Sequence, residues 1–221
     1  YLLTEFEKAA LVQYSMHSVL NDVLPNKDKL SDDLLVPIYS PNYYKKLAVF
    51  ITISNKNYND KNGKLRGCIG TTDVTSSTIV DNTKYFSIQS AFHDSRFLPI
   101  TLQEFVSIIN SQDMTYYNFN KDFSITLINK YKKSKDIHFL NTSFKIGKDV
   151  VTLKVKNRRA VYITSDYKFH GLDTEDAILR MLCRKMGNNE SCTNTNDIKD
   201  IEVLYQEGYP IKSELLLFNK E

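Results

Sequence analysis

The sequence is poor in several residues whose abundance defines particular classes of protein. Among 221 residues it has no Trp, 3 Cys, 5 Pro and 7 Gly. So few Pro and Gly exclude collagen-like and low-complexity chains, and 42% hydrophobic residues exclude a disordered one. The longest apolar runs, such as 47–53, are far shorter than the about 20 residues of a membrane-spanning helix. We therefore expect a soluble intracellular protein, cytoplasmic or nuclear, that does not bind membranes.

The cysteines and histidines favour neither disulfides nor metal. The three cysteines form no CxxC pair, which is typical of a reducing compartment and argues against a disulfide framework. The four histidines are scattered, whereas a zinc site needs closely placed ligands. We expect no metal site, and the composition names no cofactor. The cysteines are Cys68, Cys183 and Cys192.

The charge balance is close to neutral. The chain has 29 Lys and Arg against 26 Asp and Glu, a net charge of +3. A nucleic-acid-binding domain usually has a clearly stronger basic bias, so the overall charge identifies no partner. Two local clusters of basic residues stand out, at 130–135 and at 154–159.

Apolar spacing and capping residues predict the first elements. Thr4 and Glu7 form a capping box, so a helix should run from about Glu5 to about Asp22. The apolar run 47–53 predicts a strand covered on both faces, with a return strand through Leu65 after a polar turn. Tyr85, Ile88 and Phe92 recur at helical spacing, which favours a helix over 78–92.

The second half of the chain mixes further strands and helices. A second capping box at 101–104 precedes an ambiguous segment, and period-two alternation predicts a half-buried strand at 123–127. We also expect a hairpin of 150–155 and 160–164, a helix that begins after Asp173 or Thr174 and stops at Gly187, and a last strand at 201–205.

These elements lack the regular alternation of a parallel α/β fold, so they predict an α+β fold with a mixed or antiparallel sheet flanked by helices. We expect one domain over residues 1–221, with polar insertions near 110–120 and 188–196.

The segment 64–71 is the most unusual. In an extended chain, Arg66, Cys68 and Gly70 lie on one side, so a cationic group and a thiol would share a surface. Glycines weaken a strand and mark places of close backbone approach. A positive neighbour favours the nucleophilic thiolate. The alternative for Cys68 is a small buried apolar residue.

A second polar group lies at the end of the helix predicted over 78–92. Asp94 and Arg96 precede an X-Pro turn, where they can pair with each other or satisfy loose backbone groups. His93 is a candidate base for the thiol of Cys68, but the spacing does not show that they meet.

The motif Arg66-Gly67-Cys68-Ile69-Gly70-Thr71, followed by Ser90-Ala91 and by Asp94-Ser95-Arg96-Phe97 with Pro99, resembles the AMMECR domain family. The order of the predicted elements also matches that family. The resemblance implies an α+β protein with a larger and a smaller subdomain around a cleft near the motif. The family's activity is unsettled: fusion or gene neighbourhood with Memo-family and radical S-adenosylmethionine proteins hints at modification chemistry, and a role in gene expression has been proposed.

The chain departs from the family pattern at several points. Thr72 replaces the usual Phe after the motif, and Leu98 replaces the first Pro of a Pro-Pro pair. The segment 147–149 lacks the family's His before Gly. These losses argue against a mechanism that needs the family histidine.

Three hypotheses remain, and whether the protein is an enzyme stays open. The first is a catalytic or small-anion cleft, because guanidinium groups match carboxylates and phosphates. The second hypothesis, a non-catalytic protein-interaction module, is ranked level with the first. Nucleic-acid binding through the two basic clusters is the third. For the first hypothesis Cys68 is the candidate nucleophile, Asp94 and His93 are further catalytic candidates, and the ligand-binding candidates are Arg66, Gly67, Gly70, Thr71, Ser95 and Arg96.

Overall fold

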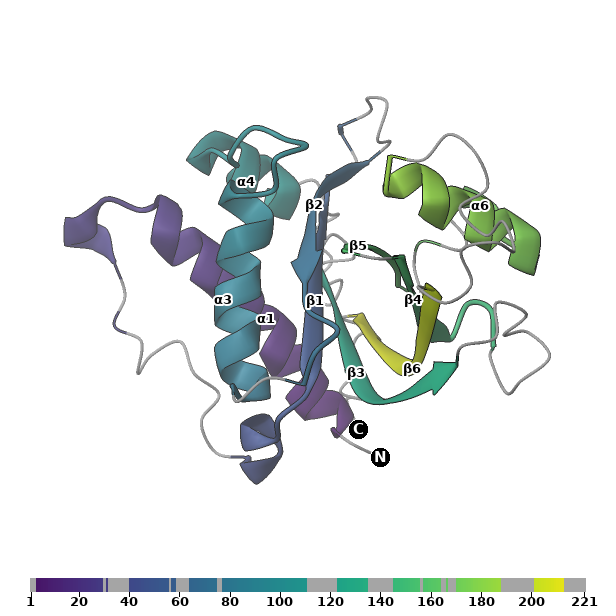
Figure 1. Ribbon diagram of the computed structural model, residues 1–221. Helices are drawn as coiled ribbons and strands as arrows, with labels where there is room; N and C mark the ends of the chain where they lie inside the picture. Colours follow the sequence, from purple (N-terminus) through teal and green to yellow (C-terminus); the bar gives the residue numbers. More distant parts are fainter. Residues whose placement is uncertain are drawn as a thin grey trace, which may run out of the picture. The chain divides into compact units, whose positions relative to one another are not determined.

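The protein forms two compact units in a computed structural model (Figure 1). The first consists of residues 1–127 with 210–221, and the second of residues 128–209. Helices combine with antiparallel strand pairs, which confirms the α+β fold; the single domain over 1–221 stays a prediction. The structure describes residues 3–29, 31, 40–55, 57–58, 64–74, 77–110, 123–134, 145–155, 157–163, 166, 170–187 and 201–212.

The helices of the first unit begin where the sequence predicts. Helix α1 (Glu5–Val23) starts at a complete capping box of Thr4 and Glu7. Helix α3 (Ile79–Phe92) starts at another box, of Thr78 and Asp81. The ambiguous segment after Thr101 is helix α4 (Leu102–Asn110). Two short 3₁₀ helices, η1 (Asn26–Asp28) and η2 (Pro41–Tyr44), lie between α1 and the first strand.

The strands of the first unit follow the order β2-β1-β3. Strands β1 (Ala48–Ser54) and β2 (Leu65–Gly70) are antiparallel. Ile51 and Ile53 are buried, whereas Phe50, Thr52 and Ser54 are partly exposed, so the expectation that this strand is covered on both faces is wrong. Strand β3 (Phe123–Ser134) is more buried than the predicted half-buried strand, because residues 125–128 are all buried instead of alternating.

Helix α3 turns an unexpected face inward. Tyr85, on the apolar stripe that predicts this helix, is 57% exposed. The buried positions include Thr83, Ser87 and Ser90, and the Ser87 hydroxyl lies 2.6 Å from that of Ser15 on α1. Small side chains let backbones approach closely, so this helix packs through small and polar residues as well as apolar ones.

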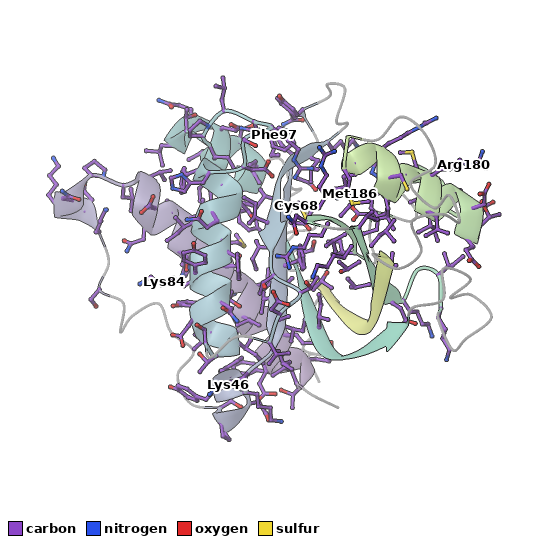
Figure 2. All side chains as sticks on the ribbon, in the orientation of Figure 1. Lys46, Cys68, Lys84, Phe97, Arg180 and Met186 are labelled. Atoms are coloured by element: carbon purple, nitrogen blue, oxygen red, sulfur yellow. The ribbon has the colours of Figure 1, made fainter. Side chains whose placement is uncertain are left out.

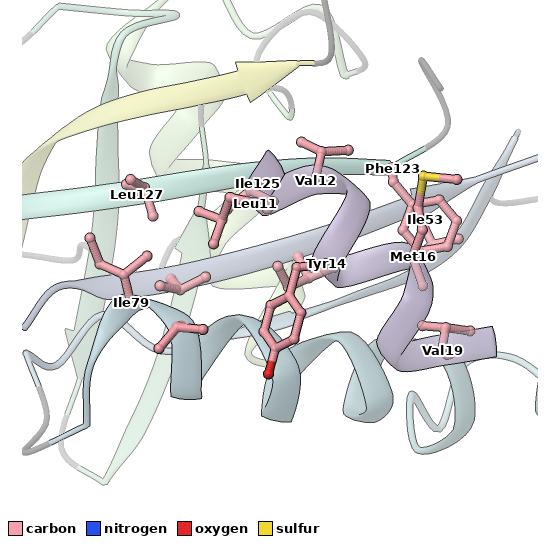
Figure 3. Packing of buried hydrophobic residues seen from close by; sticks show 14 of the residues in the cluster. Leu11, Val12, Tyr14, Met16, Val19, Ile53, Ile79, Phe123, Ile125 and Leu127 are labelled. Atoms are coloured by element: carbon pink, nitrogen blue, oxygen red, sulfur yellow. The ribbon is translucent and has the colours of Figure 1, made fainter. Parts of the chain in front are cut away.

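The core of the first unit lies between these helices and the strands. Figure 3 shows Leu11 and Met16 of α1 packed with Ile53 of β1 and Ile125 of β3. The helices therefore cover one face of β1 and β2 (Figure 1) and leave Thr52 on the other.

The second unit has its own hydrophobic core. Strands β4 (Asp149–Val155) and β5 (Arg158–Tyr162) form the predicted hairpin, and β6 (Ile201–Lys212) pairs with β4. Helix α6 (Glu175–Lys185) has Thr174 as its N-cap and is followed by Gly187 at φ 82°. Its apolar residues pack on the hairpin, as with Leu182 and Leu153.

The structure corrects one expectation about the cysteines and leaves others outside its range. Cys183 is disulfide-bonded and Cys68 is not, so the expectation against disulfides is wrong for Cys183. The polar insertions expected near 110–120 and 188–196 lie outside the described residues, apart from Asn110. Within the described part of the chain, no helix combines the length and apolar character needed to cross a membrane.

Glu7 connects α1 to η2 through a buried carboxylate. It accepts hydrogen bonds from the Thr4 N–H at 2.6 Å, from the Asn42 amide at 2.9 Å and from the Ser40 hydroxyl. Burial raises the pKa of Glu7, but hydrogen bonds from Ser40, Thr4 and Asn42 outweigh it and lower the pKa to about 2. The charged carboxylate therefore holds these two segments together.

We predict that Glu7→Gln lowers the free energy of unfolding by about 1–3 kcal/mol at neutral pH, because the amide cannot accept all of these hydrogen bonds. The pKa is lower in the folded protein, so the contribution of Glu7 is complete above its ordinary value of 4.5 and is lost as the pH falls towards about 2. Urea unfolding of both proteins between neutral and acidic pH measures this.

The exposed Glu5 provides the matched control, Glu5→Gln. A constant difference between wild type and Glu7→Gln across the acidic range would contradict the assigned role of the charge.

Candidate functional site

The signature strand β2 lies unusually close to helix α3. A Cβ atom at Gly67 would come within 2.0 Å of the Ser90 carbonyl oxygen, so no larger residue fits there without a shift. The Ser90 hydroxyl accepts from the Ile69 N–H at 2.9 Å and donates to the Ile51 carbonyl at 3.0 Å. Since Ile51 and Ile69 are partners in the strand register, the hydroxyl bridges β1 and β2. The glycine therefore admits a helix that holds the two strands together.

Arg66 is buried beneath the segment between α3 and α4. It is 3% exposed, and its guanidinium forms a two-point ion pair with Glu104, with Nη2 to Oε2 at 2.8 Å. Nη2 also donates to the Leu98 carbonyl at 3.1 Å. The guanidinium lies 4.9 Å from the centroid of the Tyr58 ring and 5.4 Å from that of Phe97. A cation stacked in this way fixes the loop and α4 against β2.

The capping box predicted at Thr101 and Glu104 is only half formed. The Thr101 hydroxyl accepts from the Glu104 N–H at 3.2 Å, as the sequence predicts. The Glu104 carboxylate binds Arg66 instead of completing the box. A long-range ion pair thus replaces a local hydrogen bond.

Asp94 and Arg96 occupy the outer edge of β2 at Cys68. The Asp94 carboxylate accepts from the Cys68 N–H at 2.9 Å, and Arg96 Nη2 donates to the Cys68 carbonyl at 3.3 Å. The pair itself is closed by Arg96 Nη2 to Asp94 Oδ2 at 2.7 Å. Burial raises the pKa of Asp94, but hydrogen bonds from Arg96 and Cys68 and the charge of Arg96 bring it below its ordinary value. Asp94 is therefore a charged positioning group.

The thiol of Cys68 lies beside the hydroxyl of Thr52. The two residues are partners in the strand register, with Sγ 3.3 Å from Oγ1. Cys68 is partly exposed, unlike Arg66. Figure 2 marks Cys68 on β2 and Phe97 beyond the end of α3. The expected shared surface of Arg66 and Cys68 is not formed, because the arginine turns into the fold.

The other candidate residues make mainly local contacts, and their expected roles stay predictions. His93 is exposed at the end of α3, where its N–H donates to the Gln89 carbonyl at 2.9 Å. Ser95 is exposed. The Thr71 hydroxyl accepts from the Asp73 N–H at 3.0 Å. At Gly70, a Cβ would come within 2.2 Å of the Val49 carbonyl oxygen, so this glycine also serves close packing.

Sequence reasoning missed the partners that give the motif its geometry. Thr52 could have been assigned as the partner of Cys68 from the strand register, but the register depends on the length of the turn between β1 and β2. Tyr58 carries no local signal for its contact with Arg66. Within the described residues, no group of three or more His, Cys, Asp or Glu side chains is placed to hold a metal ion.

Comparison with known protein families identifies the class to which this α+β fold and its glycine-containing strand belong. The AMMECR1 family model matches residues 12–204, so the chain belongs to the AMMECR1 family. A 60-residue stretch, 27% of this chain and 29% of the other, is 42% identical to an uncharacterized protein, C688.03c, of Schizosaccharomyces pombe.

A solved structure supports the fold. The crystal structure of the uncharacterized protein PH0010 from Pyrococcus horikoshii matches with a TM-score of 0.71 at 18% identity, over 95% of this chain and 93% of that one. At this identity the likeness concerns the fold alone.

We predict that Gly67→Ala destabilises the protein by about 3 kcal/mol, because the added methyl group meets backbone atoms that cannot rotate away. The control is Gly147→Ala: Gly147 has φ 81° and open space around its Cβ position. That change should cost only about 1 kcal/mol of backbone strain. Urea unfolding measures both, and equal losses would contradict the packing role of Gly67.

Glu104→Ala should lower the free energy of unfolding by about 3 kcal/mol, because it leaves the buried guanidinium of Arg66 without its carboxylate. The exposed ion pair of Glu5 and Lys8 gives a control, and Glu5→Ala should cost less than about 0.5 kcal/mol. Combining Arg66→Met with Glu104→Leu should recover most of the loss. A double variant as unstable as Glu104→Ala would contradict a mainly electrostatic cause.

Proposed function

We propose that the side of β1 and β2 that carries Thr52 and Cys68 binds a small anionic molecule. The observation that supports this is the combination of a partly exposed thiol that is in no disulfide with the guanidinium of Arg96, which is hydrogen-bonded to the backbone carbonyl of the same cysteine. Arg96 is the cationic group of the proposal, since its side chain is 42% exposed. Arg66 is left out of the ligand contacts because it is buried against Glu104.

Two features prepare these two groups. The Asp94 carboxylate holds Arg96 through Nε at 2.9 Å and Nη2 at 2.7 Å, which orients the planar guanidinium. The hydroxyl of Thr52 lies within hydrogen-bonding distance of Cys68 Sγ and either atom can be the donor, so the hydroxyl can donate to a thiolate.

The proposal concerns binding, with the thiol as a contact or a nucleophile, and includes no complete catalytic cycle. Nucleophilic catalysis by Cys requires a base within hydrogen-bond reach. The candidate base His93 is exposed at the C-terminal end of α3. Asp94 binds Arg96 and the Cys68 N–H, so in this proposal it is a positioning group and not the base.

The charge preference of the thiol tests this proposal. Iodoacetate and iodoacetamide alkylate a thiol by the same displacement of iodide, but only iodoacetate is anionic. If Arg96 attracts anions to Cys68, the ratio of the iodoacetate rate to the iodoacetamide rate should exceed that of the unfolded protein. Arg96→Gln should lower this ratio roughly threefold, as expected for the loss of one nearby positive charge. Mass spectrometry of the Cys68 peptide gives the two rates.

Lys64→Gln is the matched control, because it removes an exposed positive charge from just before β2. It should change the ratio less than Arg96→Gln does. An unreactive Cys68, or a ratio that is the same in wild type and Arg96→Gln, would overturn the proposal.

A protein-interaction module is the second candidate, and one observation favours it. Leu98 is 83% exposed, and Leu102 and Val106 on α4 are 37% and 44% exposed. Such apolar side chains are common where proteins bind one another. Cys68→Ser removes the thiol but leaves this surface intact, so retained partner binding in that variant separates the two candidates.

A further inference from the structure

The ring of Phe97 lies against two guanidinium groups. The distance from the ring centroid to the guanidinium carbon is 5.4 Å for Arg66 and 5.3 Å for Arg96. Both distances are within the about 6 Å at which a cation is attracted to an aromatic ring. Phe97 therefore contacts the buried arginine of the fold and also the exposed arginine of the proposed anion site.

The place of Phe97 is fixed from the side of Arg66. The Arg66 side chain is 4% exposed and pairs with Glu104. Its Nη2 also donates to the carbonyl of Leu98, the next residue after Phe97, at 3.1 Å. The Phe97 N–H donates to the Asp94 carbonyl at 3.0 Å. These contacts hold the ring and the backbone of Phe97 in a defined position.

The side chain of Arg96 depends more on its contacts, because it is 42% exposed. Its Nε donates to Asp94 at 2.9 Å and its Nη2 donates to the Cys68 carbonyl at 3.3 Å, which holds the edge of the guanidinium. The ring of Phe97 packs against the same planar group. A long exposed side chain has many rotamers, and each contact restricts them. Phe97 therefore adds a restraint on the position of this charge.

The charges around the ring are balanced. Two guanidinium groups close to one ring repel each other, but Arg66 pairs with Glu104 and Arg96 pairs with Asp94. Phe97 is itself only partly buried, so burial of the ring explains its placement less well than its attraction to the two cations does.

We infer that Phe97 is a positioning residue of the proposed anion site, where it holds the guanidinium of Arg96 beside Cys68. The inference rests on the proposed function, because Phe97 affects an anion through Arg96. It extends that function from the groups that would meet the ligand to the residue that places the cation. The buried Arg66, which is not among the proposed ligand contacts, supports the site by fixing the ring.

The first test measures the ratio of the iodoacetate rate to the iodoacetamide rate at Cys68. Phe97→Leu keeps an apolar side chain but removes the ring, so it should lower the ratio about twofold, less than Arg96→Gln does. Phe97→Tyr keeps the ring and should preserve the ratio. The matched control is Phe6→Leu, because Phe6 is 66% exposed in the first turn of α1. It should leave the ratio unchanged.

A double variant tests whether Phe97 acts through Arg96. In Arg96→Gln the guanidinium is absent, so the addition of Phe97→Leu should lower the ratio no further. A residue that only maintains the fold around Cys68 would have its effect in both backgrounds.

A second measurement follows Arg96 directly and does not depend on anion binding. Its Nε–H donates to Asp94, so this hydrogen should exchange slowly with water. Phe97→Leu should speed the exchange several-fold, whereas Phe97→Tyr and Phe6→Leu should not. Nitrogen-15 NMR of the arginine side chains gives the rate, and the signal is assigned by its loss in Arg96→Gln. Circular dichroism checks folding, and Phe97→Met replaces Phe97→Leu if that variant is unfolded.

Three results would overturn the inference. One is a ratio and an exchange rate in Phe97→Leu that equal those of wild type. Another is an equal effect of Phe97→Leu with and without Arg96→Gln, which indicates an action on the thiol that bypasses the guanidinium. Both of these results leave the proposed anion site intact. The third is an unchanged ratio in Arg96→Gln, which overturns the anion site and the inference together.

Discussion

The close approach of helix α3 to strand β2 is the constraint on which the signature region depends. With no Cβ at Gly67, the helix backbone comes near enough for the Ser90 hydroxyl to bridge β1 and β2. This placement also fixes the end of the helix, so that Asp94 reaches the Cys68 N–H. Gly67, Ser90 and Asp94 are thus parts of one packing arrangement.

Two ion pairs in this region differ in burial and therefore in the chemistry open to them. The side chain of Arg66, which pairs with Glu104, is 4% exposed, whereas that of Arg96, which pairs with Asp94, is 42% exposed. A buried guanidinium held at two points and stacked on rings stabilises a fold, and a partly hydrated one can still meet a ligand. This region consequently combines scaffold residues with a small number of accessible groups.

Local signals in the sequence predicted the elements better than the contacts between them. Thr4 with Glu7 marked a helix start correctly, because both residues act within one turn. The same pattern at Thr101 and Glu104 was completed differently, since a distant arginine competed for the carboxylate. The face of α3 was not predictable from Tyr85, because the helix packs closely through residues such as Ser87. The disulfide at Cys183 also had no local signal.

The position of Asp94 and Arg96 has a further consequence, for colloidal behaviour. In the strand order of the first unit, β2 is an outer strand, and exposed backbone groups on outer strands can template association with another chain. The carboxylate and the guanidinium occupy both the N–H and the carbonyl of Cys68. They therefore deny an incoming strand its hydrogen bonds at the middle of β2, so this charged pair also opposes aggregation along that edge.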